Sequence, residues 1–336
     1  MKKFEKIEMG HGSGGRKSRA LISSLFLRHW ENPFLESLGD SALLNRERQN
    51  LHFTTDSYVV RPIFFPGGDI GKLAVSGTVN DLAVSGAVPK FLSASFILEE
   101  GLPLSDLERI VLSMKAAASQ AKVLLVAGDT KVVEKGSCDR VFITTSGIGV
   151  RHPSFRGGLD TIRPGDAVLV NGEIGSHGVA VLLAREDFPF EAKVESDCAP
   201  IAGLISRVLE KANVRFMRDL TRGGLGVILN EIVEGRRFGI RIDEDAIPLN
   251  RAVSSFCELV GFDPIYIANE GKAAFIVAGK DRERALKALT SHPLGKRSRV
   301  IGEVIEEYPG RVVLRTAVGG LRLVDVPEAD QLPRIC

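Results

Sequence analysis

The chain has 336 residues, 44% of them hydrophobic, and its 44 basic and 42 acidic residues give a formal net charge of +2. This is a globular composition with room for two domains, and the balanced charge argues against nucleic acid or an anionic membrane as the main partner. Its four cysteines lack Cys-x-x-Cys spacing, and the sequence has neither an apolar leader nor a membrane-length run, so we expect a soluble cytoplasmic protein.

A glycine-rich segment, His-Gly-Ser-Gly-Gly at residues 11–15, precedes apolar residues at helical spacing over 16–30. Residues 10–15 formally match the dinucleotide pattern Gly-x-Gly-x-x-Gly, but the residues before them make a poor strand. Two interpretations stay open: a flexible loop that covers phosphates, or a solvent-exposed leader.

Two aspartates follow in contrasting surroundings. The alternating segment 51–55 predicts a strand that ends on Asp56, and the apolar spacing over 69–88 predicts a helix that Asn80 and Asp81 interrupt. An acid inside so apolar a helix is costly unless it meets a cation or hydrogen-bond donors. Asp81 is therefore a better site candidate than Asp56.

The rest of the first half alternates strands and helices. We expect a strand over 91–98, a helix over 105–121, a buried strand over 122–127 that ends in Gly-Asp-Thr-Lys (residues 128–131), and a strand over 140–150. Residues 151–163, rich in proline and glycine, are the expected linker. We therefore predict an N-terminal domain over 1–150 and a C-terminal α/β domain over 151–324.

The second half is also mixed α and β. After Asp219, Thr221 and Arg222, a pair of glycines leads into a helix that reaches Val233, which could be an anion-facing helix start. Ser176 is a plausible N-cap for a helix over 179–185. The other predicted elements are strands near 166–170, 238–242, 272–278, 299–305 and 311–316, and helices near 199–211, 249–260 and 281–290.

The sequence ends on a cysteine, Cys336, after a proline-bearing segment that favours an extended chain. We expect residues 325–336 to form a mobile tail whose thiol lies outside any core. One interpretation is an arm that carries a substrate on its sulfur. The other is a frayed end whose last residue happens to be cysteine.

Several charged residues have two interpretations. Asp56, Asp81 and Asp129 could converge at one sheet edge and hold magnesium against a triphosphate, although aspartate is also a common turn former. Lys131, at the end of its predicted strand, could contact a γ-phosphate or merely stay solvated. Glu270 lies in an Asn-Glu-Gly-Lys turn whose geometry explains the asparagine and the glycine but not the acid.

Together these motifs resemble the HypE family of hydrogenase maturation factors over essentially the whole chain. The Asn-Asp and Asp-x-Thr-Arg-Gly-Gly motifs are shared with the wider superfamily of aminoimidazole ribonucleotide synthetase and selenophosphate synthetase, and the closing Pro-Arg-Ile-Cys narrows the resemblance. The segments that carry it are residues 11–15, 55–58, 77–86, 128–133, 219–224, 269–272 and 333–336.

The resemblance implies a two-domain α/β protein that binds ATP between its domains and dimerises through N-terminal sheets forming a shared β-barrel. It implies a carbamoyl dehydratase: a HypF-type carbamoyltransferase loads the last thiol, ATP-dependent dehydration gives a thiocyanate, and the cyanide passes to a HypC–HypD complex for the iron of nickel-iron hydrogenase.

Carried over to this sequence, the family's motifs make Cys336 the carrier and Lys131 and Glu270 the catalytic pair. Lys131 would neutralise charge on the transferred phosphoryl group, and Glu270 would take a nitrogen proton. The implied magnesium ligands are Asp56, Asp81 and Asp129. The implied nucleotide contacts are Gly12, Ser13, Gly14, Asp56, Asn80, Asp81, Asp129, Thr130, Asp219, Thr221 and Arg222.

Two rival functions remain open from the sequence. One is a sister ATP-dependent synthetase of the selenophosphate or ribonucleotide type, although selenophosphate chemistry calls for an early cysteine and this chain has none before Cys138. The other is a scaffold without catalysis that docks a metallochaperone through its tail.

Overall fold

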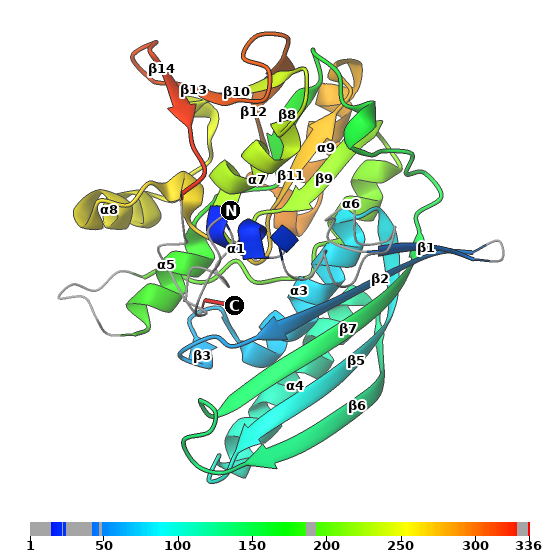
Figure 1. The fold of residues 1–336 in the computed structure, drawn as a ribbon, viewed down its shortest axis with the longest axis vertical. Helices are drawn as coiled ribbons and strands as arrows, with labels where there is room; N and C mark the ends of the chain where they lie inside the picture. Colours follow the sequence, from blue (N-terminus) through cyan, green and yellow to red (C-terminus); the bar gives the residue numbers. More distant parts are fainter. Residues whose placement is uncertain (1–14, 22, 25–41, 47–48, 186–192, 328–334) are drawn as a thin grey trace.

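The structure is a computed structural model that describes residues 15–21, 23–24, 42–46, 49–185, 193–327 and 335–336. It contains a five-stranded sheet, a seven-stranded sheet and a two-stranded ribbon, with helices packed on both larger sheets (Figure 1). The predicted mixed α/β class is confirmed. No helix in these ranges is both long and apolar enough to cross a membrane.

The first half builds the five-stranded sheet, whose strand order is β1-β2-β7-β5-β6. Only the β5–β6 pair is parallel. The elements of this half are α1 (Gly15–Leu21), β1 (Ala42–Arg46), β2 (Gln49–Tyr58), β3 (Phe64–Phe65), β4 (Gly68–Asp69), α3 (Ile70–Val84), β5 (Ala87–Glu99), α4 (Leu104–Ala121), β6 (Leu124–Val133) and β7 (Val141–Arg151).

Helix α3 is the central element of the molecule. Asp69 caps it, because its Oδ1 accepts hydrogen bonds from Gly71 N at 2.8 Å and Lys72 N at 3.1 Å. The helix is apolar on nearly every side, as a helix buried all round should be. It packs on β2, β5 and β7 of its own sheet, and also on β9 and α6 of the second half.

Strand β6 differs from its prediction in two ways. It runs to Val133, so Asp129 and Lys131 lie inside the strand rather than in a turn after it. It is also exposed rather than buried: Leu124, Val126 and Val132 are 63%, 60% and 67% accessible. The apolar residues do form the predicted strand. They are exposed because β6 is an edge strand that the described part of this chain does not cover.

The second half builds the seven-stranded sheet in the order β14-β13-β10-β12-β8-β11-β9. Strands β9 and β14 were not predicted, and the N-cap of α5 is Gly175 rather than Ser176, which is the first helical residue. The elements are β8 (Ala167–Val170), α5 (Ser176–Leu183), α6 (Ala202–Leu209), β9 (Val214–Asp219), α7 (Gly224–Val233), β10 (Gly239–Asp243), α8 (Arg251–Val260), β11 (Ala273–Val277), α9 (Arg282–Thr290), β12 (Arg299–Ile305), β13 (Val312–Arg315) and β14 (Leu321–Val324).

Asn80 of α3 joins the two halves. Its Nδ2 donates to the carbonyls of Ala199 and Glu270 at 3.1 and 3.2 Å, and its Oδ1 accepts from Ile201 N at 2.8 Å. The side chain is 2% exposed. Every polar group of this amide is therefore engaged by the main chain of the second half.

We predict that Asn80→Ala lowers the free energy of unfolding by about 3 kcal/mol, because three buried main-chain groups lose their partner. Urea denaturation measures the change. Asn50→Ala, at an exposed asparagine of β2, is the control and should change it by less than about 0.5 kcal/mol. Equal effects of the two substitutions would contradict the bridging role of Asn80.

Candidate active site

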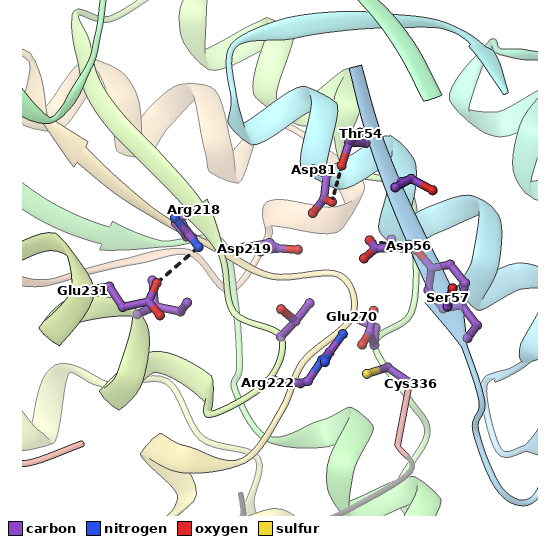
Figure 2. A pocket seen from close by; sticks show the side chains of 15 residues that line it. Thr54, Asp56, Ser57, Asp81, Arg218, Asp219, Arg222, Glu231, Glu270 and Cys336 are labelled. Carbon is purple, nitrogen blue, oxygen red and sulfur yellow. Dashed lines mark hydrogen bonds and ion pairs between the residues drawn. The ribbon is translucent and has the colours of Figure 1, made fainter. Parts of the chain in front are cut away.

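A cavity of about 350 Å³ lies where the two halves meet. Figure 2 shows its walls: β2 and α3 on one side, and on the other the end of β9, the loop after it and the turn before β11. The lining residues are Thr54, Thr55, Asp56, Ser57, Tyr58, Gly77, Asp81, Arg218, Asp219, Thr221, Arg222, Ile228, Glu231, Glu270 and Cys336.

The first wall depends on close packing of α3 against β2. A Cβ on Gly77 would come within 2.3 Å of the Tyr58 hydroxyl oxygen, so only glycine fits there. Thr54 Oγ1 donates to Asp81 Oδ2 at 3.1 Å, and Tyr58 Oη lies 3.4 Å from Asp56 Oδ2. Two aspartates from different elements are thus held at one wall.

The second wall is a glycine turn between β9 and α7. Gly223 and Gly224 have φ of +77° and +57°, and a Cβ on Gly224 would meet the Ile267 carbonyl oxygen at 2.6 Å. Asn269 holds this turn, because its Nδ2 donates to Leu220 O at 3.1 Å. Asp219, Thr221 and Arg222 therefore face the cavity from a closely packed support.

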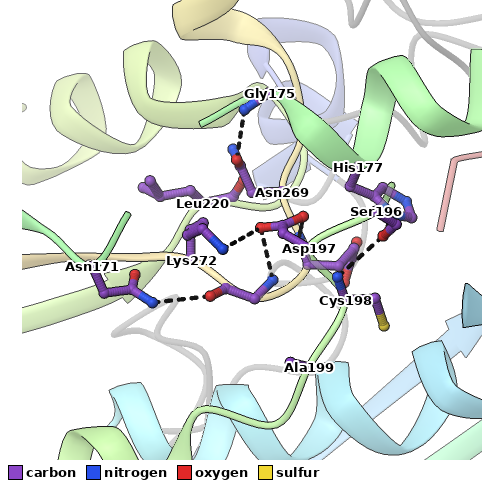
Figure 3. A network of polar contacts seen from close by, with 12 residues as sticks. Asn171, Gly175, His177, Ser196, Asp197, Cys198, Ala199, Leu220, Asn269 and Lys272 are labelled. Atoms are coloured by element: carbon purple, nitrogen blue, oxygen red, sulfur yellow. Dashed lines mark hydrogen bonds and ion pairs between the residues drawn. The ribbon is translucent and has the colours of Figure 1, made fainter. Parts of the chain in front are cut away.

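Glu270 is positioned by an acid that sequence reasoning missed. Asp197 accepts hydrogen bonds from the amides of Glu270 and Gly271, both at 3.2 Å, and pairs with Lys272 Nζ at 3.2 Å (Figure 3). Asn171 Nδ2 donates to Gly271 O at 3.0 Å. Asp197 and Asn171 act on the main chain, a role that carries no motif and depends on contacts distant in sequence.

The cavity concentrates negative charge away from water. Burial raises the pKa of Glu270 well above its usual range, and the neighbouring Asp219, Asp197 and Asp56 add to the rise. Burial also raises the pKa of Asp56. Hydrogen bonds from Asp81 and Tyr58 and the positive charge of Arg222 lower the same pKa but do not cancel the rise. Attraction to Cys336 is the largest effect that raises the pKa of Arg222, which stays a cation.

Cys336 completes the cavity, with its sulfur beside Arg222 and Glu270 (Figure 2). Val59 N donates to Cys336 O at 3.2 Å, and Ile335 is 2% exposed within the larger hydrophobic core. The expectation that the last thiol lies outside any core is wrong for this position, because Cys336 packs against the same core as Ile335.

The structure brings together most of the predicted site residues but not all. Gly12, Ser13 and Gly14 fall outside the described residues. Asp129, Thr130 and Lys131 lie on β6, where Lys131 Nζ pairs with Asp129 Oδ2 at 3.1 Å and hydrogen bonding to Lys131 lowers the Asp129 pKa. Following the cross-strand pairs from Asp129 leads through β5 and β7 to Ser57 of β2. Asp129 is therefore three strand spacings, or about 14 Å, from the strand that lines the cavity.

Comparison with known proteins accounts for the two halves. Family models for the N-terminal and C-terminal domains of AIR synthase related proteins match residues 38–151 and 163–315. The carbamoyl dehydratase HypE of Rhizobium leguminosarum bv. viciae is 47% identical over 98% of this chain and 95% of its own length. The chain belongs to the HypE family.

Solved HypE structures agree with the fold. A chain from a HypE–HypF complex superimposes with a TM-score of 0.86 at 47% identity, covering 92% of this chain and 100% of that one. HypE in complex with ATP gives 0.81 at 45% identity, covering 98% and 99%. The family resemblance predicted from the motifs is confirmed.

In this HypE-family chain, Glu270 makes stability depend on pH. Its pKa is raised in the folded state above the ordinary 4.5, so the folded protein keeps a proton that the unfolded chain has lost. Stability from this group is complete below about pH 4.5 and declines as pH rises toward the folded pKa, by about 1.4 kcal/mol per pH unit for one proton.

We predict that Glu270→Gln removes this decline, so that the variant gains stability relative to the parent as pH is raised from 4.5 to 8. Urea denaturation across that range measures the difference. Glu210→Gln, at an exposed glutamate after α6, should run parallel to the parent. A Glu270→Gln curve that also runs parallel would show that Glu270 is ionised in the folded chain.

Proposed function

We propose that this chain is an ATP-dependent carbamoyl dehydratase that converts an S-carbamoyl group on its own Cys336 to a thiocyanate. The observation that carries the proposal is the placement of the Cys336 sulfur in a carboxylate-lined cavity beside Arg222 and Glu270. HypE relatives at 47% identity bear the name carbamoyl dehydratase, and one solved HypE holds ATP.

The residues suit each step of this dehydration. The carboxamide oxygen attacks the γ-phosphorus, and ADP leaves with the electrons of the broken P–O bond. The nitrogen then loses two protons, the C–O bond breaks, and inorganic phosphate departs to leave a carbon–nitrogen triple bond on sulfur. Arg222 and Lys131 offset the phosphoryl charge, and Glu270 in its ionised form accepts a proton from nitrogen.

Magnesium fits the donors of the cavity. Within the described residues no three His, Cys, Asp or Glu side chains stand close enough to form a metal site by themselves. Magnesium usually takes one or two carboxylates and completes its shell with phosphate oxygens and water. Asp56 and Asp81 would supply those carboxylates, with Asp129 as the third ligand that the family motif implies.

A second copy of the chain would bring Asp129, Thr130 and Lys131 to the cavity. On the outer face of the five-stranded sheet, Phe53, Ile148, Phe91 and Leu124 form one cross-strand row and are 41%, 41%, 44% and 63% exposed. Such an apolar row calls for a partner. Packing two of these faces together gives the shared β-barrel of a homodimer.

The free strand edges agree with this dimer. β1 covers only Gln49–Phe53 of β2, so the edge of residues 54–58 has no partner among the described strands. The outer edge of β6 is equally open. Pairing β6 of one copy with this part of β2 in the other would set Lys131 beside Asp56 of the partner cavity.

The same proposal names the other partners. A HypF-type carbamoyltransferase loads the thiol, in keeping with the solved HypE–HypF complex. A HypC–HypD complex receives the cyanide for the iron of nickel-iron hydrogenase. All of these steps would take place in the cytoplasm.

Mass spectrometry of the peptide that contains residue 336 tests the reaction directly. After incubation with the carbamoylating partner, the peptide should gain a carboxamide, and after ATP it should lose one water. Cys336→Ala should abolish both changes, while Cys138→Ala, at a cysteine in the loop between β6 and β7 that does not line the cavity, should preserve them. ATP hydrolysis without loss of water from the peptide would contradict the proposal.

Mixing variants tests the shared site. Lys131→Ala and Glu270→Gln should each lower the dehydration rate at least a hundredfold, by about the effect of losing one catalytic group. Suppose that a site takes Lys131 from one copy and Glu270 from the other. After the two variants are mixed in equal amounts and exchange subunits, about half of the dimers are mixed, and each mixed dimer has one intact site. The mixture should then regain about a quarter of the parental activity.

A mixture that stays inactive would place both residues in the site of a single copy. Melting temperatures serve as the control, because Lys131 is exposed and its loss should leave the fold intact. A collapse of the melting temperature in Lys131→Ala would mean that this lysine is structural.

A further inference from the structure

The end of the tail is held by its main chain rather than by its thiol. His177 Nε2 lies 2.5 Å from the Ile335 carbonyl oxygen, and Val59 N donates to a main-chain carboxyl oxygen of Cys336 at 3.2 Å. Val59 directly follows β2, and His177 lies in the first turn of α5. The two hydrogen bonds therefore reach the last dipeptide from both halves of the molecule.

The surroundings of His177 determine its tautomer. A carbonyl oxygen can only accept, so Nε2 must carry the hydrogen that is donated to Ile335. Burial lowers the pKa of His177, so the ring is neutral and Nδ1 is bare. Ser196 Oγ, 2.8 Å from Nδ1, must then donate to it, while Cys198 N donates to the same oxygen at 3.1 Å.

This arrangement is rigid and closed to water. His177 has no exposed surface, and the ring of Phe65 meets it edge-on with centroids 5.4 Å apart. Ser196 is tied in turn to the loop after β3, since its amide donates to Pro66 O at 2.8 Å. The chain end passes beside His177 and Ser196 in Figure 3. The Nε2 hydrogen thus points at a fixed place that the Ile335 carbonyl fills.

We propose that His177, oriented by Ser196, is a positioning residue that docks the tail by recognising the main chain of its last dipeptide. It does not touch the reacting atoms. Because main-chain oxygens of Ile335 and Cys336 are both engaged, the sulfur is left to project toward Arg222 and Glu270. The same docking geometry then serves the free, carbamoylated and cyanated thiol.

The proposal follows from the cost of withdrawing the tail. When Ile335 leaves, a buried imidazole N–H loses its acceptor, which is costly unless water enters the groove. Docking and undocking should therefore respond to His177 although it lies outside the chemistry. The inference rests on the proposed function only for the role of the sulfur, and tail docking can be measured without any turnover.

The test is the rate at which iodoacetamide alkylates Cys336 in the full chain, followed by mass spectrometry of the peptide containing residue 336. A docked sulfur is partly shielded. His177→Leu should therefore speed alkylation, by up to about fivefold, the effect of losing one net hydrogen bond. His177→Gln keeps an N–H donor and should lie between the parent and His177→Leu. Cys138 in the same samples reports on the reagent and should react at an unchanged rate.

The matched control is His152→Leu, which removes another buried histidine, 5% exposed, from the linker after β7. It should leave alkylation of Cys336 unchanged. Ser196→Ala gives a second route if His177→Leu folds poorly: it keeps the ring, removes the group that fixes its tautomer and should speed alkylation about twofold or more.

Unchanged alkylation of Cys336 in the folded His177 and Ser196 variants would overturn the docking role. Faster alkylation together with normal ATP-dependent loss of water would support docking and function alike. Faster alkylation with no loss of water, even in the parental chain, would keep the docking role and reject the proposed reaction.

Discussion

The crowding of carboxylates at the seam between the two halves dominates this structure. Asp56 and Asp81 come from the first half, Asp219 and Glu270 from the second, and Glu270 is only 3% exposed. Ionised acids this close and this dry repel one another strongly. The raised pKa of Glu270, which favours its protonated form, and the cation of Arg222 relieve the repulsion.

Under the proposed function, that balance would link nucleotide binding to proton removal by Glu270. Cations that enter with a nucleotide, or Lys131 supplied by a second copy, would take over the role of the proton and lower the pKa of Glu270. The ionised base needed to accept a nitrogen proton would then appear only when the phosphoryl donor is present. A base that forms only when the nucleotide is bound would keep proton removal from nitrogen in step with phosphoryl transfer.

The scaffold around these charges consists of polar side chains bonded to main chain. Asn80 holds the carbonyls of Ala199 and Glu270, Asn269 holds the turn after β9, and Asp197 holds the turn before β11. Such contacts fix where the backbone runs, and so fix the positions of the candidate catalytic side chains. Asn80, Asn269 and Asp197 thus account for the rigidity of the site rather than for its reactivity.

This distinction decides how much the sequence could reveal. Helix α3, the glycine turn before α7 and the choice of Asp56, Asp81 and Glu270 as site candidates were accessible, because periodicity and motifs encode them locally. The predicted convergence of Asp129 with Asp56 and Asp81 was not found within one copy, because Asp129 lies on β6. The exposure of β6 was not, since an apolar run looks the same whether its own chain or a second copy covers it.

Other parts of the site were hidden because they depend on distant contacts. Asp197 acts on a turn 73 residues away in sequence, and His177 on a carbonyl 158 residues away. Neither residue has a periodic pattern or a spacing rule. Asn80 belongs to a motif, but only its three main-chain partners reveal the bridge that it forms between the halves.

The contacts of the last dipeptide are few enough that it can both dock and undock. Two net hydrogen bonds at about 1 kcal/mol each and one buried isoleucine at about 2 kcal/mol favour docking by about 4 kcal/mol. Fixing the backbone of two residues costs about 2 to 4 kcal/mol. The remainder is about 0 to 2 kcal/mol, so the docked state is not trapped. Under the proposed function, the sulfur moves between a transferase, this cavity and an acceptor, which requires a small docking free energy. Because docking depends on the main chain, that free energy is nearly the same for each group that the sulfur carries.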